Sequence, residues 1–255
     1  MRALILGAGR GSRLNALTEG QPKPFAPIGG RRILDWLLEA LVDAGIDDIV
    51  FIGGYRIGLV RSEYPQLTFV ENERWQQTNI LASLLCAVDY MDDGFVCTYA
   101  DILYRSTIVQ RALEHPAGSV LCVDTGWRTR YRDRSQHPED DAEKVIAKGD
   151  RVLRVSRKVN SSQAAGEYIG VARFDADSAK RVRECYHRAR HHQNGRLWRD
   201  DTLFEKAYLI HLFEEMLEVG EDFHMVTTDG EYMEVDTEED FALANEQWPR
   251  RYESP

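Results

Sequence analysis

The sequence predicts an α/β fold: a Rossmann-like, mostly parallel sheet flanked by helices, with β-hairpin and lid insertions in its second half. Three short apolar runs, at residues 2–6, 48–52 and 67–70, are bounded by glycine, proline or polar residues. Short runs of this kind are typical of buried parallel strands. Apolar residues at helical spacing separate the first two runs, and a shorter helical stretch separates the last two. This alternation predicts parallel strands whose carboxyl ends form a ligand crevice.

Composition limits the classes of protein to consider. The 255 residues and the hydrophobic fraction of 43% are sufficient for one large α/β domain or two small ones. A net charge of −10 argues against nonspecific binding to nucleic acid. No apolar run approaches the roughly 18 residues of a membrane span, so no membrane association is expected. The oligomeric state, a homodimer included, does not follow from the sequence.

The cysteines and the N-terminus indicate a reducing compartment. Cys86, Cys97 and Cys122 lie in apolar runs, and no pair of cysteines has the C-x-x-C spacing, so we interpret these three as reduced core residues. Met1 leads directly into the first predicted strand, without the pattern of a signal peptide. The cytoplasm is therefore the expected location.

The strongest functional pattern lies in the first 24 residues. Gly7, Gly9 and Gly11 follow the first strand directly, and small residues let backbone N–H groups approach a phosphate closely. Arg13 adds a guanidinium suited to phosphate oxygens, and Lys23 stands between two prolines that stiffen its backbone. The alternative is a glycine-rich turn from strand to helix with its Arg and Lys on the surface.

Two better-known glycine-rich loops are excluded. Ser12 takes the place of the last glycine of a dinucleotide-binding G-x-G-x-x-G loop, and no lysine follows Gly11 as a Walker loop requires. The pattern GxGxGSRL followed by PKP instead resembles the nucleotidyltransferases that join a nucleoside triphosphate to a phosphorylated small molecule. Ala16 departs from the proline usual in that family. The resemblance implies that the triphosphate is held by Leu6, Ala8, Gly9, Arg10, Gly11, Arg13 and Lys23.

Two aspartates are candidate ligands for Mg²⁺. Asp101 ends a predicted strand at residues 94–101, and a carboxylate at the carboxyl end of a central parallel strand points into the crevice. Asp236 lies in the segment EVDTEED, which resembles the segment of the same family that carries its second metal carboxylate. Mg²⁺ prefers one or two carboxylates together with phosphate oxygens. The alternative for each aspartate is a helix cap, and Thr237 with Asp240 forms an approximate capping box.

A helix with one apolar face is predicted from residue 79 onward. Thr78 or Asn79 can cap this helix. The pattern TN followed by SL resembles the cytidylyltransferase branch of the family, which implies that Thr78, Asn79 and Ser83 face the bound base. The two interpretations are compatible.

An irregular insertion opens the second half of the chain. Residues 126–142 show no periodic apolar face and combine Trp127 and Tyr131 with arginines and acidic residues. We interpret this segment as a lid that faces the substrate, and a solvated loop of mixed charge is the alternative.

A hairpin is predicted at residues 144–155, with Lys144 and Lys158 on its flanks and a strand at residues 166–174 after it. The order AEKV, hairpin, SRKV and GEYIG resembles bacterial phosphocholine cytidylyltransferases and their phosphonate-handling relatives. The resemblance implies acceptor contacts from Trp127, Tyr131, Lys144, Lys158, Glu167 and Tyr168.

The resemblance also implies an overall organisation and a reaction. It implies one nucleotidyltransferase domain over residues 1–255, with about residues 1–125 binding the nucleotide and about residues 126–255 binding the acceptor. The implied reaction is Mg²⁺-dependent transfer of CMP from CTP to a phosphocholine- or aminoethylphosphonate-like acceptor, with release of pyrophosphate. Catalytic positive charge would come from Lys23, Arg13, Lys144 and Lys158.

Two other functions stay open. A sugar-1-phosphate nucleotidyltransferase using UTP or dTTP would share the first half of the chain, but the AEKV and GEYIG segments argue against it. A module that binds CTP without turnover is the second alternative. The presence of both candidate metal carboxylates argues against that module.

The C-terminal third is predicted as two helices, a hairpin and a last helix. The first two helices are expected at residues 175–192 and 203–219, and the hairpin pairs residues 223–227 with residues 231–235. The histidines of the first helix lack the spacing of a zinc-protease helix, and we interpret them as a solvated helix end. They are His187, His191 and His192.

Overall fold

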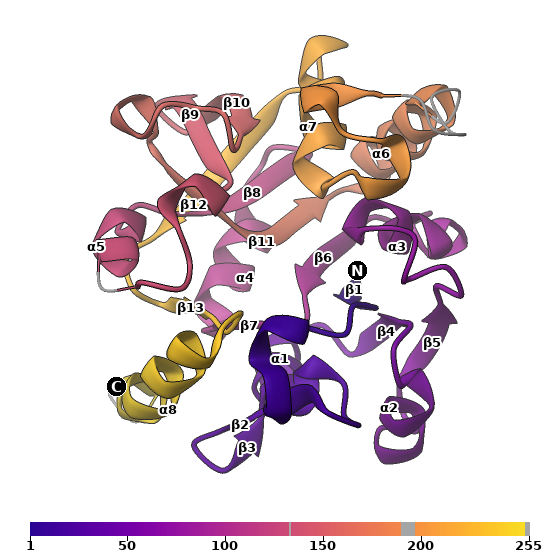
Figure 1. The fold of residues 1–255 in the computed structure, drawn as a ribbon. Coiled ribbons are helices and arrows are strands. Elements are labelled where there is room, and N and C mark those ends of the chain that lie inside the picture. The colour runs from indigo at the N-terminus through magenta and orange to yellow at the C-terminus, as the bar shows by residue number, and fades with distance from the viewer. Residues whose placement is uncertain (133, 190–196, 253–255) are drawn as a thin grey trace.

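The structure is a computed structural model that describes residues 1–132, 134–189 and 197–252 (Figure 1). Within these residues the main feature is a nine-stranded sheet. Its strands lie in the order β5 (Thr68–Glu71), β4 (Asp48–Gly53), β1 (Arg2–Gly7), β6 (Phe95–Tyr99), β11 (Gly166–Phe174), β8 (Ser119–Asp124), β12 (Phe223–Thr228), β10 (Arg151–Ser156) and β9 (Lys144–Lys148). The predicted α/β class is confirmed.

The half of the sheet built from the N-terminal strands is parallel, as predicted. β1 pairs in parallel with β4 and β6, and β4 pairs in parallel with β5. Ala3 and Ile5 pack into the core on one face of the sheet, and Leu4 and Leu6 pack into the core on the other. Successive side chains of a strand point to opposite faces, so burial on both faces explains the unbroken apolar run of β1.

The other half of the sheet is mixed and curls back on itself. β11 runs antiparallel to both β6 and β8, whereas β12 is parallel to β8. The predicted hairpin of β9 and β10 forms, and β9 also pairs with β11. Because β11 runs antiparallel between β6 and β8, the carboxyl ends of β1, β6, β8 and β12 all lie at one edge, called here the carboxyl edge.

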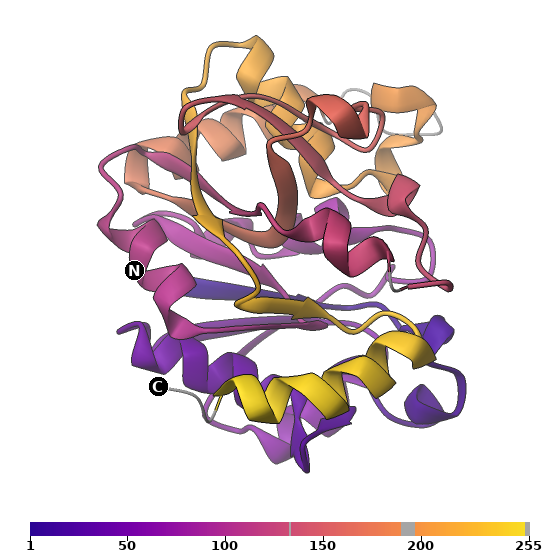
Figure 2. The same cartoon turned by 90° about the vertical axis from the view of Figure 1, so that its left-hand side faces the viewer.

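Helices cover both faces of the sheet (Figure 2). α1, α2, α4 and α8 share a core with Ala3 and Ile5, and α3, α6 and α7 share a core with Leu4 and Leu6. Their bounds are α1 Ile33–Asp43, α2 Ile57–Glu63, α3 Ile80–Cys86, α4 Ser106–Glu114, α6 Ala176–Ala189, α7 Leu209–Glu218 and α8 Glu238–Tyr252. None of the helices in the described ranges is both long and apolar enough to cross a membrane.

Two small sheets and several 3-10 turns complete the fold. β2 (Pro27–Ile28) pairs with β3 (Arg31–Arg32), and β7 (Ile102–Tyr104) pairs with β13 (Tyr232–Glu234), both antiparallel. The glycine-rich loop runs into a 3-10 helix at Ser12–Thr18, and Lys23–Phe25 forms another.

The structure corrects three predicted elements. Residues 223–235 form no hairpin, because β12 joins the large sheet and β13 crosses to β7. The second C-terminal helix begins at Leu209, after a separate 3-10 turn at Phe204–Lys206. The segment at 126–142 contains a helix, α5 (Trp127–Arg132), because two aromatic residues four positions apart suffice to bury one face against Ala142.

Two further predictions concern helix ends. The capping box of α8 forms, since the Asp240 N–H donates to the Thr237 hydroxyl at 3.2 Å and an Asp240 carboxylate oxygen accepts from the Thr237 N–H at 2.9 Å. The first C-terminal helix, α6, ends at Ala189. His187 is exposed on it, and His191 and His192 lie outside the described residues.

We expect Gly170→Ala to destabilise the fold by about 2–3 kcal/mol. Gly170 lies in an irregular part of β11 at φ +81°, and an added Cβ would overlap the ring of Tyr99. The substitution therefore combines backbone strain with overpacking. Urea unfolding measures the change.

Gly149→Ala is the matched control: its φ is +63° but an added Cβ meets no atom within 4 Å, so only about 1 kcal/mol of strain is expected. Equal losses in the two variants would contradict the overlap.

Candidate active site

A cavity of about 370 Å³ opens at the carboxyl edge of the sheet. Ligand sites of α/β sheets lie at this edge, and the volume is within the range of small-molecule pockets. Its walls come from both halves of the chain: the loop after β1, the turn after β6, the start of α3, and segments around β9, β11 and β13. Of the sequence-predicted residues it is lined by Leu6, Ala8, Gly9, Gly11, Arg13, Lys23, Thr78, Asn79, Ser83, Asp101, Tyr131, Glu167, Tyr168 and Asp236.

The centre of the cavity is an ion cluster. The Nζ atom of Lys23 lies 2.6 Å from Oδ2 of Asp101 and 2.5 Å from Oδ1 of Asp236. Both aspartates thus face one ammonium group, although 135 positions separate them in the sequence (236 − 101). The pairing of β7 with β13 accounts for this: Glu234 lies opposite Ile102, and the Val235 N–H donates to the Asp101 carbonyl at 2.9 Å.

The charges of this cluster stabilise one another. Burial by itself lowers the pKa of Lys23, but the carboxylates of Asp101 and Asp236 outweigh burial and raise that pKa above its ordinary value. Burial raises the pKa of Asp236, but the Lys23 ammonium and the Arg13 guanidinium outweigh it and lower that pKa. At neutral pH, Lys23 is therefore protonated and Asp236 is ionised.

The glycine-rich loop lies directly over the stem of Lys23. Gly11 adopts φ +69°, and a Cβ there would lie 2.6 Å from Cδ of Lys23. Any other residue would therefore strain the backbone and overlap the Lys23 side chain. Arg13 forms an ion pair with Asp236 and stands 3.7 Å from Asp141. Arg10 differs from its neighbours: it is exposed, its guanidinium lies 5.8 Å from the Tyr55 ring centroid, and it is not among the lining residues.

The polar side chains at the start of α3 form a second wall. The buried Asn72 donates to the hydroxyls of Thr78 and Ser83, both at 3.0 Å, and so fixes their positions. Asn79 stands at the N-cap position, but its side chain caps nothing and donates to the Lys206 carbonyl. The predicted capping by Thr78 or Asn79 is therefore wrong, because both side chains have other partners.

A third wall, called here the acidic–aromatic wall, combines buried carboxylates with tyrosines. The Tyr131 hydroxyl donates to Glu167 at 2.6 Å, and the Tyr99 hydroxyl donates to Glu143 at 3.1 Å. Arg157 lies 3.5 Å from Glu143 and covers the Tyr208 ring at 3.9 Å. Burial raises the pKa of both Glu143 and Glu167.

Sequence reasoning missed several lining residues, which come from separate elements. They are Trp75, Tyr99, His137, Asp141, Glu143, Arg157, Tyr208, Tyr232 and Glu234. A signal was available for three of these, because Glu143, Arg157 and Glu234 lie within the recognised segments AEKV, SRKV and EVDTEED.

Comparison with known protein families identifies the family to which this chain belongs. The family model of the MobA-like NTP transferase domain matches residues 3–139, more than half of the chain. The chain belongs to this family of nucleotidyltransferases. The sequence-based recognition is confirmed at this level.

Two curated relatives and one solved structure extend over most of the chain. This chain is 28% identical over 246 residues to the CTP:phosphoglutamine cytidylyltransferase of Campylobacter jejuni. The match covers 92% of this chain and 96% of the relative. The chain is also 28% identical to the 2-aminoethylphosphonate cytidylyltransferase of Lancefieldella rimae, over 73% of this chain and 72% of the relative. The structure of the Streptococcus pneumoniae CTP:phosphocholine cytidylyltransferase aligns with a TM-score of 0.73 at 21% identity, over 96% of this chain and 97% of that one. The last likeness shows the fold.

Three residues that were expected to contact the acceptor lie outside the cavity. Lys144 is buried and its ammonium points to the Glu139 carbonyl at 3.4 Å. Lys158 is exposed and lies 3.3 Å from Asp200. Trp127 is buried against Tyr131 and Ala142. None of the three lines the cavity. Trp127 packs inside the α5 segment, Lys144 is directed to a backbone carbonyl, and Lys158 lies beside acidic residues outside the cavity.

The carboxylates of the MobA-like site fit a divalent cation of the magnesium type. Asp101 and Asp236 offer hard oxygen atoms at the same point of the cavity, the donor type that Mg²⁺ prefers. Lys23 already demonstrates that a cation is held there by both groups.

A titratable pair, the buried His137 and the half-buried Glu234, lies close to Asp236. His137 stands 3.5 Å from Glu234 and 3.6 Å from Asp240. Burial and the neighbouring charge of Asp236 raise the pKa of Glu234 to about 8. Burial lowers the pKa of His137, but the contact with Asp240 and the charge of Glu234 outweigh burial and raise it. The pKa shift of each group depends on the charge of the other, so near neutral pH Glu234 and His137 hold one proton between them.

We expect the free energy of unfolding to fall by about 1–3 kcal/mol from about pH 5 to pH 8. The pKa of Glu234 is about 8 in the folded chain against 4.5 ordinarily, so the folded chain binds the extra proton in that window and loses stability as the pH rises. His137 acts in the same direction, because its raised pKa stabilises the fold only while the ring is protonated.

Glu234→Gln should flatten this profile in urea unfolding at a series of pH values. Glu184→Gln, at an exposed position of α6, is the matched control and should keep the wild-type slope. An unchanged slope in Glu234→Gln would remove this residue as the cause.

Proposed function

We propose that the protein transfers CMP from CTP to a small phosphorylated or phosphonylated acceptor that carries a cationic amine, releasing pyrophosphate with the help of Mg²⁺. The observation that carries this proposal is the contact of one lysine, Lys23, with both Asp101 and Asp236 inside a cavity. The glycine-rich loop and the acidic–aromatic wall line the same cavity.

The nucleotide occupies the side built by about residues 1–125. Backbone N–H groups from Ala8 to Gly11 receive the triphosphate, with Lys23 and Arg13 beside them. The base faces Thr78, Asn79 and Ser83, whose polar atoms suit the edge of a pyrimidine. CTP is favoured over UTP by the names of the two relatives described above, which are cytidylyltransferases matched over 92% and 73% of this chain.

The acceptor oxygen attacks the α-phosphorus and the bond to pyrophosphate breaks. Both reactants are anions, so their repulsion is the main barrier, and Lys23 and Arg13 reduce it with charge held in a fixed place. An ionised phosphate or phosphonate oxygen needs no general base. Asp101 and Asp236 would hold Mg²⁺, which supplies Lewis-acid stabilisation to phosphate oxygens. The Lys23 ammonium is then free to donate to the phosphates.

The acceptor occupies the side built by about residues 126–255. Glu143 and Glu167 are buried among tyrosines, an environment that favours a cation over a second anion. An amine on the acceptor would pair with these carboxylates while its phosphate faces Lys23. The named acceptors of both relatives, phosphoglutamine and 2-aminoethylphosphonate, contain an amine.

Pyrophosphate release tests the reaction. We expect turnover with CTP, Mg²⁺ and at least one amine-bearing phosphate or phosphonate acceptor, and at least about tenfold slower turnover with UTP or dTTP. Turnover of sugar 1-phosphates alone would replace the proposal with the sugar-nucleotide alternative. Calorimetric CTP binding without release of pyrophosphate from any acceptor would replace it with a binding module.

Lys23→Ala and Asp101→Asn should each lower kcat/KM by at least about 100-fold, because each removes a charge that contacts the reacting phosphates or their metal. Lys158→Ala, which changes an exposed lysine outside the cavity, is the matched control and should stay near the wild-type rate. Circular dichroism checks that each variant folds. A folded Lys23→Ala enzyme with the wild-type rate would refute the role of Lys23.

Glu167→Gln should raise the KM for an amine acceptor about tenfold, since it removes one charge-assisted contact. The KM for CTP should stay unchanged, and this is the internal control. The glutamine can still accept the hydrogen bond from Tyr131. An equal effect on both substrates would mean that the substitution disturbs the whole cavity rather than the acceptor side.

A further inference from the structure

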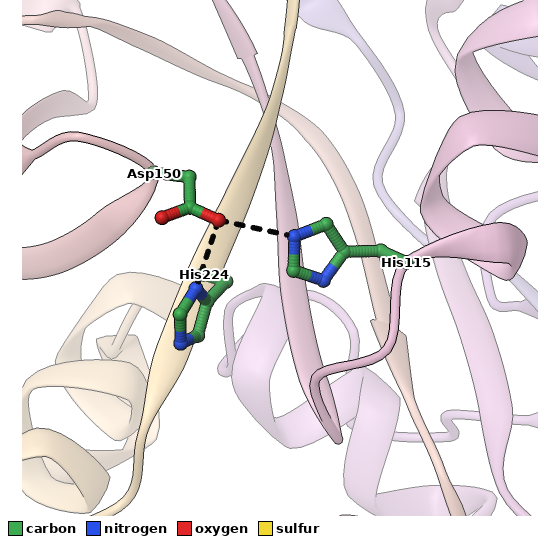
Figure 3. A group of neighbouring side chains, drawn as sticks. All are labelled: His115, Asp150 and His224. Carbon is green, nitrogen blue, oxygen red and sulfur yellow. Dashed lines mark hydrogen bonds and ion pairs between the residues drawn. The ribbon is translucent and has the colours of Figure 1, made fainter.

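A second cluster of ligand-type side chains lies at the opposite edge of the sheet (Figure 3). His115 follows α4, Asp150 lies in the turn between β9 and β10, and His224 is the second residue of β12. His224 pairs with Val120 near the start of β8, so the cluster is at the amino ends of these parallel strands. None of the three residues lines the cavity.

The spacing of the side-chain atoms matches that around a tetrahedral ion. Oδ2 of Asp150 lies 3.3 Å from Nε2 of His115 and 3.2 Å from Nδ1 of His224, and the three candidate ligand atoms all lie within 4.8 Å of one another. Zinc bonds of about 2.0–2.2 Å place tetrahedral ligand atoms about 3.3–3.5 Å apart. Two of the three separations are therefore compatible with a bound zinc ion, although His–Asp hydrogen bonds and ion pairs have the same length.

The orientation of His224 supplies an independent observation. Its Nε2 faces Oδ2 of Asp222 at 3.3 Å, as in the carboxylate–histidine–metal arrangement that orients metal-binding imidazoles. With the ring proton on Nε2, Nδ1 has a lone pair aimed at the Asp150 carboxylate. That Nδ1 atom is buried and has no hydrogen-bond partner among the described residues. In this tautomer two electron-rich atoms face each other 3.2 Å apart, and a cation between them would satisfy both.

We propose that His115, Asp150 and His224 form a binding site for a divalent transition-metal ion of the zinc type, oriented by Asp222. Imidazole nitrogen together with one carboxylate selects such an ion over Mg²⁺ or Ca²⁺, which prefer oxygen. The fourth position is open to water, because Asp150 is exposed. The site is independent of the proposed transferase activity.

Binding requires one change at His115. Its Nδ1 accepts the Ala117 N–H at 3.1 Å, so the neutral ring carries its proton on Nε2, which faces Asp150. The ion displaces that proton to Nδ1, and the bond from Ala117 is lost. The loss is one neutral hydrogen bond, which a metal–nitrogen bond replaces.

The ion would tie three segments together. The turn of the β9–β10 hairpin already contacts β12, since the Met225 N–H donates to the Asp150 carbonyl at 2.8 Å and Arg151 pairs with His224. Ligation adds the segment after α4 to this junction. The consequence is a stability that depends on the metal, because an ion bound only by the folded chain stabilises it.

Calorimetric titration of Zn²⁺ into the full chain, in excess Mg²⁺ to compete at Asp101 and Asp236, tests the site. We expect one Zn²⁺ per chain, confirmed by elemental analysis, and a rise in Tm. His224→Gln and Asp150→Asn should each weaken binding by about 100-fold and abolish the rise in Tm, and Asp222→Asn should weaken binding by about 10-fold. Metal-free Tm values establish that the variants fold.

His187→Gln is the matched control, since this histidine is exposed on α6 outside the cluster. It should bind Zn²⁺ as the wild type does. Loss of binding in His187→Gln or in His137→Gln would place the ion on α6 or in the cavity and overturn the proposal. Unchanged affinity in His224→Gln, or no binding by the wild type at micromolar Zn²⁺, would overturn it equally.

Discussion

The contact between one ammonium group and two carboxylates is the constraint on which the site depends. Asp101 and Asp236 repel each other, and a buried carboxylate without a partner is costly. Lys23 removes both penalties at once, and Gly11 leaves room for its stem. The cluster thus fixes the relative positions of the glycine-rich loop, the end of β6 and the segment after β13. In the proposed function, Mg²⁺ would take the place of the Lys23 ammonium between these two carboxylates.

The surroundings of the cluster divide the cavity into regions of opposite character. The loop after β1 offers backbone N–H groups and Arg13, whereas the acidic–aromatic wall offers Glu143 and Glu167. Burial raises the pKa of both glutamates, so the fold bears an electrostatic cost that a cationic ligand would relieve. Residues held at such a cost in a cavity are typical of binding sites.

The sequence predicted the features that local patterns encode. The parallel strands, the glycine-rich loop and the aspartates all follow from contiguous residues, and all were placed at the cavity or in the sheet. The acidic–aromatic wall was only partly predicted, because Glu143, Arg157 and Tyr208 come together through the closure of β9 on β11. Lys144 and Lys158 were placed at the acceptor because the segments AEKV and SRKV resemble those of a known family, but such a resemblance does not say which way a side chain points. The hairpin at residues 223–235 failed because pairing with β8 and β7 competes with the local turn.

The short ladder between β7 and β13 has a consequence for how the chain matures. It joins Ile102 to Glu234, so the second carboxylate reaches Lys23 only after the chain has been synthesised beyond Asp236. Contacts so distant in sequence form late and slowly. During translation the emerging N-terminal half would therefore hold a phosphate loop and a lysine that faces a single acid. Catalytic competence would arrive in one step with the last strand, and partially made chains would remain inert.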